Sequence, residues 1–190
     1  MLTQFNGSRH LNLTLALLKP DITRMPYSLE QVRQLILKQG FIAIRSNIIP
    51  KMSRTQAEEF YKEHKSRFFY NRLVTYMSSG SVHAHVLALP SDSPTGTIAI
   101  TAWRTLMGPT KVMKTRYTEP ETIRGLFGLS DTRNCSHGSD SLETAEREIK
   151  FFFPNFDLDA FAGSLEEEEF LKQYVGNVLK LDRANFVHYI

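Results

Sequence analysis

Residues 11–18 read LNLTLALL, an alternation of apolar and polar side chains that runs into a continuous apolar stretch. This pattern is typical of a β-strand that is buried in a sheet. Lys19, Pro20 and Asp21 follow, and proline ends a strand because it lacks the backbone N–H that a strand donates to its neighbour. The segment therefore predicts a buried first strand that ends at Lys19.

Outward from this strand, helical and extended patterns alternate along the chain. Segments rich in β-branched and apolar residues predict further strands at 41–49, 81–89 and 134–137. Capping boxes predict helix starts at Ser28 and Ser53, since each serine is followed by a glutamine at the third position after it. Helices are expected at 28–40, 53–64, 68–79, 97–107, 122–127 and 140–152, and irregular segments at 90–96 and 111–121.

This order of elements predicts an α+β fold. A four-stranded antiparallel sheet covered on one face by helices would accommodate it, and the ferredoxin-like arrangement is the nearest common solution. The length of 190 residues and the ordinary shares of hydrophobic (42%) and charged (23%) residues fit one folded domain. We predict a domain at 11–156, an N-terminal extension at 1–10, and a C-terminal tail at 157–190 that contains an amphipathic helix.

Composition excludes several classes of protein and site. Cys135 is the single cysteine, so an internal disulfide and a cysteine-rich zinc site are excluded, which favours a reducing compartment. No apolar run approaches the roughly 20 residues of a membrane span, and no GxxxxGKS or GxxxxGKT sequence provides a P-loop. The net charge of +3 suits an anionic ligand without indicating a specific nucleic-acid partner. These features predict a soluble intracellular protein.

His83 and His85 alternate on one face of the strand predicted at 81–89, so they could form a metal-binding pair. No clear third ligand follows in the sequence. A half-exposed strand face is the simpler interpretation of the two histidines.

His137 lies within RNCSHGSDS, residues 133–141, where small neighbours leave its side chain uncrowded. Gly138 permits sharp backbone geometry, and the serines after it would open a helix with free N–H groups. The positive end of that helix disfavours an imidazolium, so the histidine would stay neutral and nucleophilic. Glu148, farther along the same helix, could reach back and fix the ring tautomer. A structural loop histidine is the alternative that spacing alone leaves open.

Three cations stand beside glycine or proline at the boundaries of predicted elements: Lys19, Arg104 and Arg124. Together they would suit a multiply charged anion such as a polyphosphate. For any one of them alone, ordinary surface charge is the alternative.

At these residues the chain resembles the nucleoside diphosphate kinase family. The resemblance covers roughly residues 11–156 and rests on motifs that occur in this order: TLALLKPD (14–21), FYKEHKSRFFYNRLVTYMSSG (60–80), WRTLMGPT (103–110), TIRGLFG (122–128) and NCSHGSDS (134–141). The sequence DTRN before the histidine and EEEE after the domain are most similar to the divergent type 6 branch, which is associated with mitochondria. Since residues 1–12 carry no acidic side chain, as in many transit peptides, we predict a mitochondrial location, with the cytoplasm as the alternative.

The resemblance implies a kinase that moves the γ-phosphate of a nucleoside triphosphate, usually ATP with Mg²⁺, to a nucleoside diphosphate by a ping-pong mechanism. His137 would carry the phosphate, supported by Ser139 and Glu148. Asp140 would lie beside the phosphate–Mg²⁺ region, the metal being carried by the nucleotide. The residues implied to contact the nucleotide are Lys19 and Tyr61 at the transferring phosphate and the ribose side, Arg67, Arg104, Thr110 and Arg124 at the phosphates, Phe69 and Leu73 at the base, and Asn134 at the ribose 3′-hydroxyl.

The sequence also departs from the family pattern. The segment between Thr110 and Arg124 and the loop 90–96 are longer than usual, and the tail beyond Asn155 does not match. Because the first segment normally packs around the threefold contacts of family hexamers, we predict a monomer or dimer. Asp131 stands where an apolar residue near the base is usual, which predicts a changed base preference or weaker binding. These departures keep open an alternative function, a nucleotide-binding or scaffold protein whose kinase activity is weak or depends on a protein partner.

Overall fold

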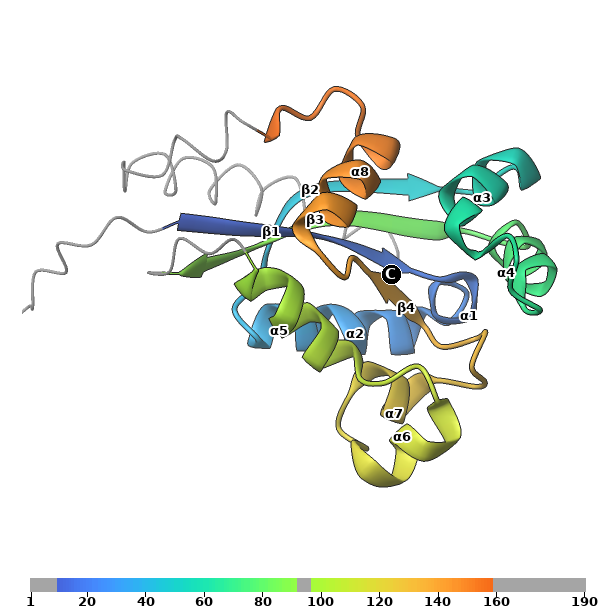
Figure 1. The fold of residues 1–190 in the computed structure, drawn as a ribbon. Helices are drawn as coiled ribbons and strands as arrows, with labels where there is room; N and C mark the ends of the chain where they lie inside the picture. The colour runs from blue at the N-terminus through green and yellow to red at the C-terminus, as the bar shows by residue number, and fades with distance from the viewer. Residues whose placement is uncertain (1–9, 92–96, 159–190) are drawn as a thin grey trace, which may run out of the picture.

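The structure is a computed structural model that describes residues 10–91 and 97–158 (Figure 1). Most of the predicted N-terminal extension, most of the loop 90–96 and the predicted amphipathic helix of the tail lie outside the described residues. Within the described ranges, no helix is both long and apolar enough to cross a membrane.

The sheet has four antiparallel strands in the order β2-β3-β1-β4: β1 (His10–Leu18), β2 (Ile42–Ile49), β3 (Val82–Ser91) and β4 (Ser136–Gly138). The central strand β1 pairs with β3 over its whole length and with β4 through Leu17 and His137. This topology confirms the predicted ferredoxin-like α+β fold. The predicted strands are all present, although β3 continues through Pro90 and Ser91, which the sequence places in a loop.

Helices cover both faces of this sheet, so the prediction of a single covered face is wrong. Side chains alternate along β1, and Leu15 and Leu17 enter one core while Ala16 and Leu18 enter the other. All four side chains are fully buried. A strand that is apolar at consecutive positions needs cover on both sides, which the run LALL already required.

The first core is closed by α3 (Arg54–Phe60), α4 (Tyr70–Met77) and α8 (Leu142–Phe152). The second core is closed by α2 (Pro26–Lys38) and α5 (Ile98–Met107). Figure 1 shows α8 on one side of the sheet and α2 and α5 on the other. A 3₁₀ turn, η1 (Lys62–His64), joins α3 to α4, and this α3–η1–α4 hairpin replaces the longer helices predicted at 53–64 and 68–79.

Local capping sets the ends of several helices. At Ser53 the predicted capping box is confirmed: the serine hydroxyl accepts the Gln56 N–H at 3.1 Å, and the Gln56 side chain accepts the Ser53 N–H at 2.8 Å. The predicted box at Ser28 is wrong, because α2 already begins at Pro26. Proline suits the first position of a helix, where its missing N–H has no intrahelical partner to lose.

The segment 111–121, predicted to be irregular, contains the helix α6 (Val112–Thr118), so that prediction is wrong as well. Thr115 is fully buried, and its hydroxyl bonds to the carbonyls of Pro109 at 3.1 Å and Lys111 at 3.0 Å. Arg116 donates to the carbonyl of Gly128 at 2.5 Å. The short helix α7 (Ile123–Phe127) follows, at the position predicted for one helical turn.

Candidate active site

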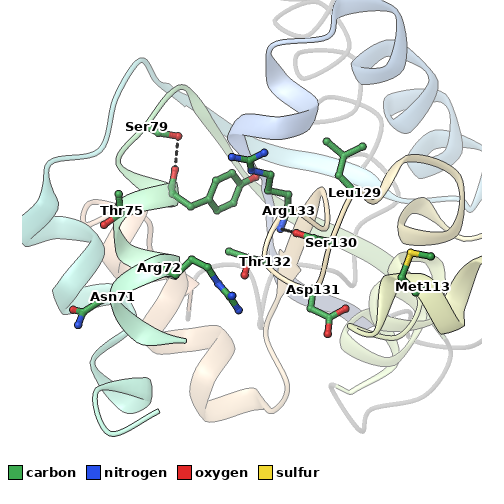
Figure 2. Close-up of a pocket in the computed structure, with 11 residues that line it drawn as sticks. Asn71, Arg72, Thr75, Ser79, Met113, Leu129, Ser130, Asp131, Thr132 and Arg133 are labelled. Atoms are coloured by element: carbon green, nitrogen blue, oxygen red, sulfur yellow. Dashed lines mark hydrogen bonds between the residues drawn. The ribbon is translucent and has the colours of Figure 1, made fainter. Parts of the chain in front are cut away.

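A cavity of about 850 Å³ lies between α4, α6 and the segment 129–133 (Figure 2). Arg72 and Arg133 line it, together with Met113 and Asp131. Both arginines lie within stretches that carry the family resemblance, but the sequence assigned neither of them a role. Asp131 is the lining residue that the family resemblance places near the base.

Asp131 is engaged with the longer segment of the chain rather than standing alone. Its carboxylate accepts the Val112 N–H at 3.2 Å and pairs with Lys111 Nζ at 3.0 Å. Both contacts are at the start of α6. The carboxylate therefore fastens α6 to the segment that leads into β4.

His137 lies on β4, and its backbone is fixed from α5. Trp103 Nε1 donates to the His137 carbonyl at 3.2 Å. A Cβ atom added to Gly138 would meet the Trp103 ring at 2.3 Å, so only glycine lets β4 approach α5 this closely. The His137 side chain remains 21% exposed.

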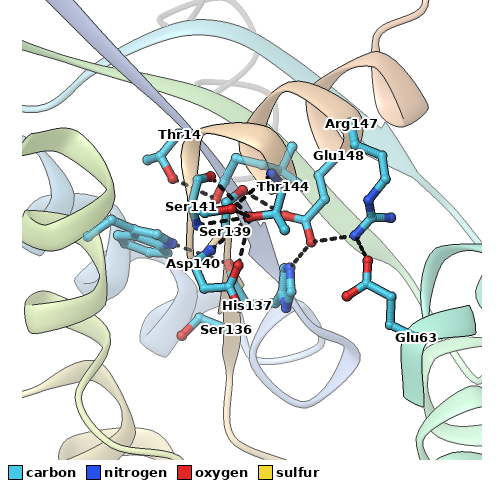
Figure 3. Close-up of polar contacts among 12 residues, drawn as sticks. Thr14, Glu63, Ser136, His137, Ser139, Asp140, Ser141, Thr144, Arg147 and Glu148 are labelled. Carbon is cyan, nitrogen blue, oxygen red and sulfur yellow. Dashed lines mark hydrogen bonds and ion pairs between the residues drawn. The ribbon is translucent and has the colours of Figure 1, made fainter. Parts of the chain in front are cut away.

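The ring of His137 faces Glu148, as the sequence predicted (Figure 3). Nε2 lies 3.0 Å from Glu148 Oε1, and Ser139 donates its hydroxyl to Oε2 at 2.7 Å. Burial alone would raise the pKa of Glu148, but His137, Ser139 and Arg147 together hold it below its ordinary value. An ionised carboxylate only accepts hydrogen bonds, so Nε2 carries the proton. In the neutral ring, Nδ1 is then the nitrogen with a free electron pair.

The segment before β4 is strained and is held from the start of α1 (Pro20–Thr23). Cys135 has φ of +67°, a left-handed conformation that is uncommon for residues other than glycine. Its N–H donates to Asp21 Oδ2 at 2.9 Å, and its carbonyl accepts the Lys19 N–H at 2.8 Å. Asp21 in turn accepts a short hydrogen bond from the Tyr76 hydroxyl. Asp21 and Tyr76 lie within quoted motifs, but the sequence assigned them no role.

Cations gather beside His137 at the floor of the site. Lys19 is buried and donates to Asn134 Oδ1 at 2.7 Å. Burial, and then the charge of Arg124, lower the pKa of Lys19 to about 8. Arg124 is also buried and donates to the carbonyls of Gly108 at 2.6 Å and Ser136 at 3.0 Å.

Two buried polar atoms at this floor have no hydrogen-bond partner among the described residues. They are the hydroxyl of Tyr61 and Nε of Arg124. The pKa of Tyr61 is raised above its usual range by burial and by the charge of Glu148, so the phenol keeps its proton. Buried polar groups in folded proteins nearly always have partners. These atoms are therefore suited to binding a polar ligand.

The other predicted site residues differ in their contacts and in their exposure to solvent. Ring contacts connect Phe69 to His137 through His64 and Tyr61, with centroid distances of 5.6, 6.2 and 5.9 Å along the chain of rings. Burial, and then the nearby charge of Arg104, lower the pKa of the Arg124 guanidinium to about 10. The remainder differ in exposure: Arg67, Thr110 and Asp140 are exposed, and Leu73 is 8% exposed within the first core.

His83 and His85 are buried between β3 and α2, so the expectation of a half-exposed strand face is wrong. His85 Nδ1 lies 2.8 Å from the Ser46 hydroxyl. Burial and the nearby charge of Arg33 lower the pKa of His83 to about 4, and burial, His83 and Arg33 lower that of His85 to about 3. A guanidinium beside the pair also disfavours a metal cation. In the described part of the chain, no group of three or more potential metal ligands occurs.

Comparisons with known proteins agree with this arrangement. A family model described as nucleoside diphosphate kinase matches residues 12–158. The chain is 50% identical to nucleoside diphosphate kinase 6 of Danio rerio over 146 residues, covering 77% of this chain and 78% of that protein. It is 47% identical to nucleoside diphosphate kinase 6 of Homo sapiens over 159 residues, covering 84% and 80%. The solved structure of the Aquifex aeolicus nucleoside diphosphate kinase is similar with a TM-score of 0.68, at 34% identity, over 75% of this chain and 95% of that one.

Proposed function

The chain belongs to the nucleoside diphosphate kinase family and is similar to its type 6 members, and from this premise we propose that it transfers the γ-phosphate of a nucleoside triphosphate to a nucleoside diphosphate through a phosphorylated His137. The observation that carries the proposal is the pairing of His137 Nε2 with the ionised Glu148. The pairing holds the proton on Nε2 and keeps the electron pair of Nδ1 available for attack.

The reaction has two half-steps. In the first, Nδ1 of His137 attacks the γ-phosphorus, an N–P bond forms, the bond from phosphorus to the β–γ bridging oxygen breaks, and the nucleoside diphosphate leaves. In the second, a terminal oxygen of a different diphosphate attacks the same phosphorus and the N–P bond breaks. Glu148 keeps its hydrogen bond to Nε2 throughout, and stabilises the positive charge that the ring acquires when Nδ1 is phosphorylated.

Charge neutralisation supports both half-steps, because phosphoryl transfer depends mainly on positioning and electrostatics. Lys19, Arg124 and the Tyr61 hydroxyl stand at the floor where the transferring phosphate would lie. We assign Arg67, Arg104 and Thr110 to the other phosphates and Asn134 to the ribose 3′-hydroxyl. Phe69 stacks on the base, with Leu73 beside it, and a stacking contact tolerates different bases.

Mg²⁺ would enter with the nucleotide and neutralise phosphate charge. Magnesium sites of this kind use one or two carboxylates together with substrate phosphates. Asp140 fits that role in its chemistry, since its exposed carboxylate follows Ser139 at the start of α8, where Oδ1 accepts a hydrogen bond from Thr144 at 2.8 Å.

Labelling of the full-length protein with ATP that carries ³²P at the γ-position tests this function. We expect acid-labile label on the wild type, none on His137→Ala, and transfer of the label to any added nucleoside diphosphate. Nucleotide binding without label would instead support the alternative, a binding or scaffold protein. One observation supports this alternative. Asp131 binds the start of α6, and the segment that contains α6 is where the chain departs from its family.

We also propose a mitochondrial location, supported by the acid-poor residues 1–12 and the similarity to type 6 members. A fluorescent protein fused to the C-terminus should localise to mitochondria, and a cytoplasmic signal would refute this.

A further inference from the structure

Arg147 lies on α8 between two carboxylates that belong to different parts of the molecule (Figure 3). Its Nη2 forms a short ion pair with Glu63 on η1. The same nitrogen lies 3.7 Å from Glu148 Oε1. That oxygen is also the one that faces His137 Nε2 at 3.0 Å. Arg147 and His137 therefore approach one oxygen of Glu148.

We propose that Arg147 is a positioning residue for phosphoryl transfer, which orients Glu148 toward His137 and connects this pair to the hairpin that binds the nucleotide. The inference rests on the proposed function and assigns to it a residue that acts through Glu148, without contact to the reacting atoms.

The contacts of Glu148 explain how a neighbouring charge can orient it. Ser139 fixes Oε2 at 2.7 Å, while His137 and Arg147 approach Oε1. His137 contacts Oε1 within hydrogen-bond distance, whereas Arg147 at 3.7 Å acts on the same oxygen through its charge. With both oxygens engaged, the carboxylate resists rotation, and the His137 ring keeps one orientation. The Arg147 side chain is 34% exposed, so solvent screens part of its charge, and orientation is its main contribution.

Glu63 extends this contact to the α3–η1–α4 hairpin. It lies between Tyr61 and Arg67 in the sequence, and the ring of its neighbour His64 contacts both Tyr61 and Phe69. The hairpin thus carries four of the residues assigned to the nucleotide, Tyr61, Arg67, Phe69 and Leu73. Its ion pair with Arg147 joins the hairpin to α8, which carries Glu148. The pair is consequently a direct link between nucleotide binding and the orientation of His137.

Four single variants of the full-length protein separate this role from a general effect of charge. Arg147→Gln removes both contacts, Arg147→Lys keeps the charge, and Glu63→Gln removes only the link to the hairpin. Lys150→Gln is the matched control, since it also removes a cation from an ion pair on α8, with Glu146 at 2.6 Å, on an exposed surface. The rate of His137 labelling in a single turnover is measured against ATP concentration for each.

We expect Arg147→Gln to lower the maximal labelling rate about tenfold, the factor that corresponds to 1.4 kcal/mol. Arg147→Lys should restore most of the rate. Glu63→Gln should raise the half-saturating ATP concentration more than it lowers the maximal rate, and Lys150→Gln should match the wild type. Because Glu63 acts only through Arg147, the double variant should label no more slowly than Arg147→Gln alone.

A second measurement does not depend on turnover. Nitrogen-15 NMR of the imidazole ring should find the proton of His137 on Nε2 in the wild type and distributed over both nitrogens in Arg147→Gln, with circular dichroism unchanged. If Arg147→Gln matches Lys150→Gln in labelling and in the NMR signature, the positioning role is refuted. If the wild type itself is not labelled, the proposed function fails, and the NMR comparison alone decides whether Arg147 positions the pair.

Discussion

Replacement of Glu148 by glutamine tests the central contact of the site with little change in shape. Glu148 accepts from Ser139 at 2.7 Å and from His137 at 3.0 Å. A glutamine can keep both contacts, because its oxygen accepts from Nε2 and its NH₂ group donates to the serine hydroxyl. The substitution removes the charge and leaves the hydrogen-bonded pairs in place.

The magnitude follows from the loss of that charge. Hydrogen bonds to charged groups contribute about 1.5–3 kcal/mol and neutral ones about 0.5–1.5 kcal/mol. The hydrogen bond that holds the His137 ring in place therefore becomes weaker by roughly 1–1.5 kcal/mol. This corresponds to about a tenfold lower rate of His137 phosphorylation. Glu148 is 5% exposed, and a neutral side chain avoids the cost of burying a charge, which offsets the stabilisation that the lowered pKa of the carboxylate indicates. The free energy of unfolding should therefore change by less than about 1 kcal/mol.

Single-turnover labelling with ATP and urea unfolding measure the two quantities on one preparation. Glu146→Gln is the control, since it removes a carboxylate from an exposed pair with Lys150 on the same helix. A Glu148→Gln protein that labels as fast as this control would refute the orienting role. A protein that no longer folds would show that the carboxylate is structural.

Further outcomes follow from burial and from the departures of the sequence. Burial lowers the pKa values of His83 and His85 from 6.5 to about 4 and about 3, so the unfolded chain takes up protons first as pH falls. The two shifts correspond to roughly 3 and 5 kcal/mol of stability. Urea unfolding should show stability falling from pH 6.5 towards pH 4, and His83→Leu/His85→Leu should flatten that slope; an equally steep slope in the variant contradicts the assignment. Burial raises the pKa of the Cys135 thiol, so iodoacetamide should modify the folded protein far more slowly than the urea-unfolded one, as mass spectrometry would show; equal rates would contradict this. Light scattering should give a mass near 21.8 kDa or twice that value, because the family resemblance implies that the longer segment 111–121 would not fit the usual hexamer contact; six times this mass would overturn the expectation.

The parts of the fold that the sequence predicts are those with signals confined to a few neighbouring residues. The strand β1 follows from its apolar run, and the capping box at Ser53 needs only four positions. The helix α6 lacks such a signal. Its stability comes from contacts across the chain, such as Arg116 to Gly128 and Val112 to Asp131. The sequence of such a segment therefore predicts an irregular structure, because the residues that stabilise its helix are distant in the chain.

Burial of polar side chains is also set by tertiary structure. The period of two places His83 and His85 correctly on one face of β3, but nothing local shows that α2 covers this face. Arg33 of α2 is buried as well, so the helix presents a cation where its sequence pattern predicts a polar surface. The position of Arg33 beside the two rings disfavours a metal ion there, and the sequence alone does not show this position.

For the candidate site, too, the sequence indicates which residue types take part, and the fold shows where they lie. The sequence predicts Lys19 and Arg124 as polyphosphate ligands, because both are cations beside proline or glycine at the boundaries of elements. For either residue alone, the sequence leaves ordinary surface charge as an alternative. Both are buried, and burial lowers their pKa values to about 8 and about 10. A lowered pKa means that each positive charge costs free energy in the folded chain. A bound polyphosphate supplies the counter-charge that offsets this cost, so the burial of these cations is an argument for an anionic ligand that does not depend on the family.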